Sequence, residues 1–125
     1  MKTKVVAYWA ATGVLAFCIG SGGAAELAQV PGNVQGLAAL GYPAYFVMLI
    51  GLWKVLGAIA VLVPGFPRLK EWAYAGFAIT LVSALVAHLA VGDGVEAWSW
   101  PVGTGVLWGA SYFFFRRLQA GAAAI

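Results

Sequence analysis

The sequence predicts an all-α integral membrane protein, a four-helix antiparallel bundle with a short interfacial helix in its first loop. Of the 125 residues, 63% are hydrophobic and only 9% are charged, whereas soluble domains have roughly 25% charged residues. Apolar runs of roughly 20 residues, the length that crosses a bilayer as a helix, recur four times between turn residues. We therefore expect lipid to cover most of the apolar surface and residues 1–125 to form a single transmembrane domain.

The predicted helices occupy most of the chain. The four spans are residues 5–27, 44–63, 73–91 and 99–115, and the interfacial helix is residues 34–40. Helices are expected because backbone exposed to lipid must form its hydrogen bonds within its own segment. Asn33 is expected to cap the short helix and Gly41 to end it. Since the other connections are short, sequential spans should be antiparallel.

The basic residues predict the orientation of these spans. On one side of the bundle lie Lys2, Lys4, Arg68, Lys70, Arg116 and Arg117. The other side has no Lys or Arg and carries Glu26, Asp93 and Glu96. The positive-inside rule then places both termini in the cytoplasm of a multi-pass protein of the cell inner membrane. Basic groups at a membrane boundary, rather than in one patch, do not indicate nucleic-acid binding.

A cluster of polar residues is predicted inside the outer half of the bundle. Lys54 falls near the bilayer midplane, where a charge costs about 2.5–3.5 kcal/mol and needs a partner. His88 and the terminal Glu26 of the first span should lie toward the same surface, so the three side chains should converge. The inner half is expected to be apolar and closed. Candidate wall and rim residues are Tyr42, Tyr45, Trp53 and Trp98.

Two interpretations of this cluster are open at this point. Glu26 and Lys54 could form an ion pair that only fixes the helix register. Alternatively, the cluster is a ligand or proton site, because ionisable residues within membranes often line pathways and relays. A metal site is not predicted, since the chain has one His, one Cys and no pair of them at a ligand spacing. The single Cys18 is expected to act as a small hydrophobic residue.

Several stretches resemble the DoxX-like family of small four-helix membrane proteins. They are Leu40-Gly41-Tyr42-Pro43, Lys54-Val55-Leu56-Gly57-Ala58, Val63-Pro64, Lys70-Glu71-Trp72-Ala73-Tyr74-Ala75-Gly76 and Ala87-His88. The resemblance implies a four-helix bundle in which Lys54 and His88 match recurring polar positions. It also implies a link to quinone-dependent oxidoreductases, such as thiosulfate:quinone oxidoreductase, and to redox-stress complexes. This chain has Ala87 where related proteins carry Ser before the intramembrane His.

The leading functional hypothesis is a membrane component of a redox system that binds a quinone or a similar lipid-soluble molecule. Lys54 would donate to an oxygen of the ligand, His88 would exchange a proton, and Glu26 would set their charge. No intrinsic cofactor and no catalytic residue is assigned, so electrons would come from a soluble redox partner.

Other functions and assemblies are kept as alternatives. One is a non-catalytic scaffold or assembly factor, and another is a small proton-coupled transporter, for which Glu26 lies too near a helix end. A homodimer through Gly105 and Gly109 is a further expectation, because small residues at this spacing allow close helix packing.

Overall fold

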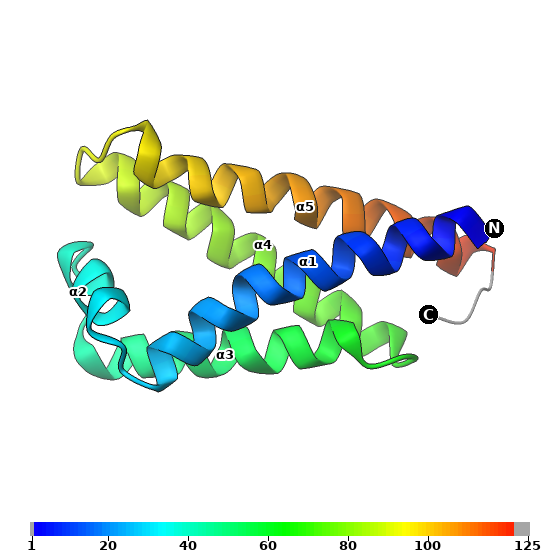
Figure 1. The fold of residues 1–125 in the computed structure, drawn as a ribbon, viewed down its shortest axis with the longest axis horizontal. Helices are drawn as coiled ribbons and strands as arrows, with labels where there is room; N and C mark the ends of the chain where they lie inside the picture. The colour runs from blue at the N-terminus through cyan, green and yellow to red at the C-terminus, as the bar shows by residue number, and fades with distance from the viewer. Residues whose placement is uncertain (1, 122–125) are drawn as a thin grey trace.

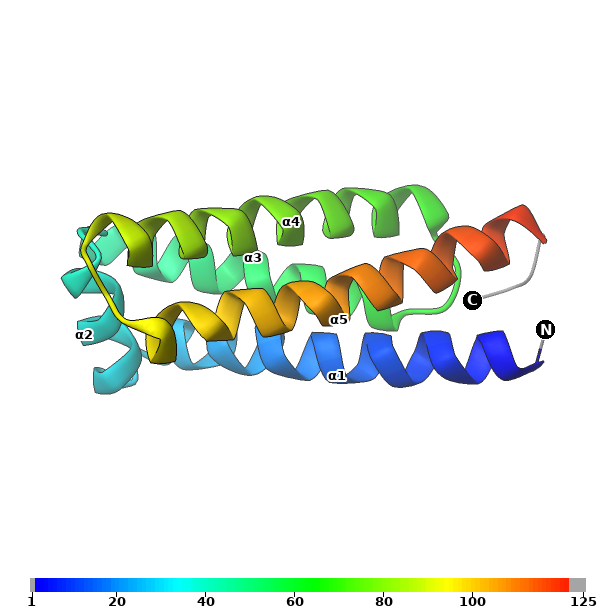
Figure 2. The ribbon, with the colours of Figure 1, turned by 90° about the horizontal axis from the view of Figure 1, so that it is seen from above.

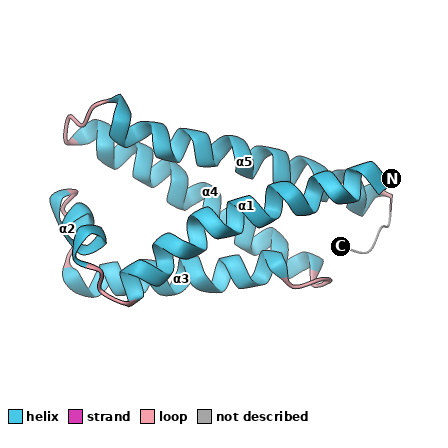
Figure 3. Cartoon of the chain, in the orientation of Figure 1, coloured by secondary structure: helices cyan, strands magenta, loops and turns pink. Residues whose placement is uncertain are grey.

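The computed structural model describes residues 2–121, which form five helices and no strand. The helices are α1 (Lys2–Leu27), α2 (Pro31–Ala39), α3 (Ala44–Leu62), α4 (Pro67–Ala90) and α5 (Val95–Ala120) (Figures 1 and 3). The all-α prediction is confirmed. Helices α1, α3 and α4 are long and apolar enough to cross a membrane. The predicted spans 5–27, 44–63 and 73–91 fall on these three helices.

The four long helices lie side by side, with each contacting two others. α1 packs against α3 and α5, and α4 packs against the same two helices (Figure 2). α2 contacts α1 and α3 at one end of the molecule, which we call the α2 end. The start of α1 and the end of α5 lie at the opposite end (Figure 1). This basic end carries Lys2, Lys4, Arg68, Lys70, Arg116 and Arg117.

Prolines move two helix starts from their predicted positions. α4 begins at Pro67 instead of residue 73, because a proline in the first turn lacks only an N–H that the helix does not need. For the same reason, α2 begins at Pro31. The prediction that Asn33 caps this helix is wrong, because Asn33 lies within it. Gly41 does follow the end of α2, with a φ of 94° that favours glycine.

The ends of α1, α3 and α5 also differ from the predicted spans. The fourth predicted span, residues 99–115, is extended in both directions to form α5, whose first turns include Pro101. α1 begins at Lys2, before the predicted residue 5, and α3 ends at Leu62, one residue before the predicted 63. The charged residues at the basic end therefore lie on continuous helix rather than in loops.

Glycines let α1 and α3 approach until their backbones touch. A Cβ added at Gly51 would lie 2.7 Å from the carbonyl oxygen of Gly23, and one added at Gly23 would lie 2.8 Å from that of Gly51. Real Cβ atoms do not approach backbone this closely, so neither position accepts a side chain without moving a helix. One turn away along α1, Gly20 faces Ala58. The crossing of α1 and α3 is therefore fixed by small residues.

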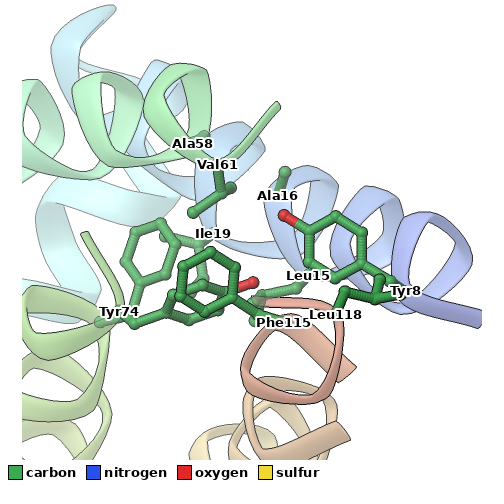
Figure 4. Close-up of a cluster of buried hydrophobic side chains, with 10 residues drawn as sticks. Tyr8, Leu15, Ala16, Ile19, Ala58, Val61, Tyr74, Phe115 and Leu118 are labelled. Carbon is green, nitrogen blue, oxygen red and sulfur yellow. The ribbon is translucent and has the colours of Figure 1, made fainter. Parts of the chain in front are cut away.

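A cluster of buried apolar residues lies toward the basic end of the bundle. Its buried apolar residues come from α1, α3, α4 and α5 and include Tyr8, Leu15, Ile19, Val61, Tyr74, Phe77, Phe115 and Leu118 (Figure 4). Tyr8 and Tyr74 are only 0% and 1% exposed. Their rings pack against Phe115 from two sides. These rings fill the space between α1, α4 and α5 at this end.

The prediction that the inner half is wholly apolar is wrong. The hydroxyl of Ser111 lies 2.6 Å from the hydroxyls of both Thr12 and Tyr74, and all three groups are buried. These hydrogen bonds join α1, α4 and α5. Ser and Thr were not singled out in the sequence because each can satisfy its hydroxyl within its own helix, which hides the cross-helix pairing.

Lys70 holds the end of α3 in place. Its side chain is fully buried, and its ammonium donates hydrogen bonds to the backbone carbonyls of Ala60, Val61 and Val63. The last carbonyls of a helix lack partners within the helix and carry partial negative charge, which a cation stabilises. The ring of Trp9 lies 5.7 Å from the same ammonium. Lys70 is thus a structural cap as well as a basic residue at this end.

Replacing Gly51 with alanine should destabilise the bundle. The new Cβ would collide with backbone of α1, so we expect a loss of about 1–3 kcal/mol. Thermal unfolding in detergent, followed by circular dichroism, measures it. Gly22→Ala is the matched control, because a Cβ there meets nothing within 4 Å. Equal melting temperatures for the two variants would contradict the close crossing.

Lys70→Met should also lower stability, since it removes the hydrogen bonds to three carbonyls at the end of α3. Hydrogen bonds to charged groups are each worth about 1.5–3 kcal/mol, so we expect a loss of at least about 2 kcal/mol. The same melting experiment on Arg68→Met supplies the control, because Arg68 is exposed two residues away. A Lys70→Met protein as stable as Arg68→Met would rule out the capping role.

Candidate ligand site at the α2 end

Glu26 and Lys54 form a buried ion pair between α1 and α3. The Lys54 ammonium donates to Glu26 Oε1 at 2.7 Å. The two side chains are 4% and 11% exposed, respectively. A charge in an apolar interior needs a partner of opposite sign, and a pair at this distance satisfies both groups. The structure therefore brings together two of the residues that the sequence singled out.

The ion pair lies one helical turn from the close crossing of α1 and α3. Gly23 and Gly51 make the contact between α1 and α3, and Glu26 and Lys54 each follow their glycine by three residues. Lys54 lies midway along α3, and its side chain reaches toward the α2 end, where α1 finishes. This direction follows the general lean of helical side chains toward the helix N-terminus. The glycines are thus positioning residues for the pair.

A cavity of 740 Å³ adjoins the ion pair at the α2 end. All five helices contribute to its wall. Lys54 and Trp53 come from α3, Glu26 and Cys18 from α1, and Trp100 from α5. Small-molecule sites usually have volumes of about 300–1,000 Å³, with apolar walls and a few polar groups. The cavity meets this description.

The polar groups of the ion pair are not all used by the pair itself. Glu26 Oε2 is buried and accepts no hydrogen bond from the residues that the structure describes. The Lys54 ammonium has three N–H groups. One of them donates a hydrogen bond to Glu26. The Trp100 ring lies 5.9 Å from the Lys54 ammonium, within the range of a weak cation–π contact. The site can therefore offer both a hydrogen-bond donor and an acceptor.

His88 lines the same cavity but bonds to a different residue. Its Nδ1 lies 2.7 Å from Asp93 Oδ2, in the turn after α4, and not against Glu26 or Lys54. Asp93 also donates its backbone N–H to the His88 carbonyl, which closes the end of α4. The Asp93 side chain is 40% exposed, whereas His88 is 22% exposed. His88 thus stands between the cavity and the surface.

The remaining predicted site residues divide into two groups. Trp53 lines the cavity, whereas Tyr45 and Trp98 are not among the described residues that line it. Tyr45 is 75% exposed. Trp100, two residues beyond Trp98, supplies the aromatic wall on α5 instead. Because consecutive helical residues are separated by about 100°, the sequence alone could not decide which tryptophan faces inward.

Asn33 was not expected in the cavity wall, whereas Tyr42 was expected at its rim and Thr80 on the face of His88. Thr80 and Ser83 on α4, Asn33 on α2 and Tyr42 after it line the cavity. The regular spacing of Thr80, Ala84 and His88 indicated this face, and all three do line the cavity. Asp93 was treated only as a charge outside the spans, although its place in the Gly92-Asp93-Gly94 turn after His88 could have indicated the pairing.

No group of three or more His, Cys, Asp and Glu side chains in residues 2–121 is arranged to hold a metal ion. Cys18 is only partly buried and lines the cavity. The chemistry that the site presents is therefore that of one ion pair, one His–Asp pair, a few hydroxyl and amide groups, and aromatic rings.

The fold and site define a helical membrane protein with an ion pair buried beside a ligand-sized cavity. The chain belongs to the DoxX-like family, whose profile (DoxX_2) matches residues 10–111. That range includes Glu26, Lys54, His88 and Trp100. The family expected from the sequence is thus confirmed. Comparison with curated proteins and with solved structures gave no match.

Separating the ion pair should cost more than removing it. Glu26→Gln or Lys54→Met alone leaves one charge buried without a partner, at a cost of about 3–5 kcal/mol, whereas the double variant should recover much of this loss. Thermal unfolding of all four proteins gives the coupling energy. The exposed pair Arg116–Glu71 is the control, since such pairs contribute about 0–1 kcal/mol. Losses that simply add in the double variant would show that Glu26 and Lys54 do not interact.

Proposed function

We propose that this protein spans the membrane with four helices, α1, α3, α4 and α5, and that its basic end faces the cytoplasm. α5 packs along α1 and α4 and has the same length as α1, which supports a fourth span. The positive-inside rule supports the orientation, because the basic residues gather at one end. In the inner membrane of a cell, α2 would then lie at the outer surface, and the cavity would open in the outer half of the bilayer.

Within this topology, the function is to bind a quinone or a similar lipid-soluble molecule as part of a redox system. The observation that carries the proposal is the cavity of 740 Å³ beside an ion pair with unused polar groups. Lys54 can donate to the carbonyl oxygen of a quinone, and Glu26 Oε2 can accept from the hydroxyl of the corresponding quinol. Trp53 and Trp100 provide flat apolar walls for the ring. One site can thus hold both forms of the ligand.

His88 and Asp93 provide the connection to water. Reduction of a quinone to a quinol adds protons together with electrons, and the protons must come from outside the apolar wall. His88 lies on the cavity, and its partner Asp93 is more exposed. Histidine commonly transfers protons near neutral pH because its ordinary pKa lies close to that pH. In this proposal, the pair passes a proton between the surface and a bound ligand.

The electrons are supplied by a soluble redox partner in this proposal. The protein then acts as the membrane subunit that holds the quinone, and the partner carries out the transfer. Membership of the DoxX-like family is consistent with this role but does not specify the ligand.

A scaffold function would leave the cavity without a role. The cavity-filling experiment described below tests this alternative too. If Glu26 and Lys54 only lock the fold, filling the cavity will affect neither ligand binding nor any partner-dependent activity.

Filling the cavity should abolish quinone binding without unfolding the protein. Gly22 lines the cavity, and a Cβ there meets nothing within 4 Å, so Gly22→Leu places a side chain in the ligand's space. Isothermal titration calorimetry of purified protein in detergent, with a dimethoxy-methyl-benzoquinone as the probe, should show at least about a tenfold loss of affinity. Gly13→Leu is the control, since Gly13 is on the same helix, faces open space and lies outside the cavity.

His88→Gln separates the proton role from the binding role. It keeps a polar group of similar size but cannot carry a proton, so quinone affinity should stay within about threefold while the rate of partner-dependent quinone reduction falls by about a hundredfold. Stopped-flow absorbance follows the reduction. An unchanged rate would remove His88 from the proposed mechanism.

A further inference from the structure

A second hollow, here called the α3–α4 groove, lies between α3 and α4 on the outside of the bundle. Its volume is 770 Å³. The wall is almost wholly apolar and includes Leu56, Ile59, Trp72, Ala73, Phe77 and Ile79. Leu56, Ile59 and Ile79 are 46%, 53% and 68% exposed, so this wall faces the lipid rather than the bundle interior. The α3–α4 groove is therefore a place for hydrocarbon.

The groove and the cavity share part of their walls. Trp53 and Lys54 of α3 and Ile79 and Thr80 of α4 line both hollows. α3 and α4 pack closely where a Cβ at Gly57 would lie 2.6 Å from the Phe77 ring, and the two helices diverge toward the α2 end (Figure 1). Lys54, whose ammonium is bonded to Glu26, lines both the apolar groove and the cavity that contains the polar groups. The two hollows together could hold an amphiphile, with its polar head in the cavity and its apolar tail in the groove.

We propose that the α3–α4 groove holds the hydrocarbon tail of the molecule whose polar head occupies the cavity. The ligand is thus a membrane-resident amphiphile, with a head that reaches Lys54 and an isoprenoid or acyl tail lying along α4. It enters sideways from the bilayer between α3 and α4, without passing through water. This inference rests on the proposed function and adds the tail, the tail's position and the direction of entry.

Two observations favour one continuous ligand over a bulk lipid chain lying in the groove. The polar end of the groove is the same Lys54 that lines the cavity, so a chain in the groove leads directly to the ion pair. Gly76 lines the groove as well, and a Cβ there meets nothing within 4 Å. The missing side chain keeps the groove open on the α4 side.

The experiment compares two probes that have the same head. A dimethoxy-methyl-benzoquinone without a tail and its decyl-tailed counterpart are titrated calorimetrically into protein at one fixed detergent concentration. The proteins are the wild type, Gly76→Leu and Gly103→Leu. Gly103 is a matched control on α5, because it also faces open space and lies outside both hollows. Partition of the tail into micelles is the same for each protein, so it cancels when the affinity ratios of the two probes are compared.

Gly76→Leu should lower the ratio of tailed to tail-less affinity by about tenfold, because leucine occupies the tail's space. Its affinity for the tail-less probe should match that of the wild type, which also shows that the variant is folded. Gly103→Leu should behave as wild type with both probes. An unchanged ratio in Gly76→Leu would overturn the tail site and leave the proposed function standing. Failure of the wild type to bind either probe would overturn both.

Discussion

The ion pair between Glu26 and Lys54 is the constraint on which the rest of the structure depends. Two charges can lie inside an apolar bundle only if they meet, and they meet because glycines let α1 and α3 touch. The contact of Gly23 with Gly51 sets the distance between the helices, and Glu26 and Lys54 follow each glycine by three residues. A small change in this crossing would separate the charges. Packing and electrostatics therefore specify the same register of α1 on α3.

The two ends of the bundle then take different forms. At the basic end, aromatic rings, the hydroxyls of Thr12, Tyr74 and Ser111, and the Lys70 cap join the four long helices. At the α2 end, α3 and α4 diverge and leave a cavity bounded by the ion pair, His88 and Trp100 (Figure 1). The packed basic end contributes to stability, and the α2 end is where we propose that a ligand binds.

The sequence was sufficient where the membrane itself imposes a rule. Length and hydropathy located three spans, and the cost of burying a charge led to Glu26 as the partner of Lys54. The sequence was insufficient where the rotation of a helix about its axis decides which side chains face inward. Trp100 rather than Trp98 lines the cavity, and Ser111 bonds across helices, because neither choice is encoded in hydropathy. The pairing of His88 with Asp93 depends on a loop whose path only the fold reveals. Proline at the first turns of α2 and α4 explains why their starts were misplaced.

Native mass spectrometry of protein released directly from its own membrane can detect a ligand in the cavity without any prior choice of ligand. We expect a protein peak that carries one additional molecule with the mass of a quinone. Gly22→Leu should lose that adduct, and Gly13→Leu should keep it. A wild-type protein without any adduct of this kind, or an adduct retained equally by Gly22→Leu, would contradict the claim that the cavity beside Glu26 and Lys54 is a ligand site.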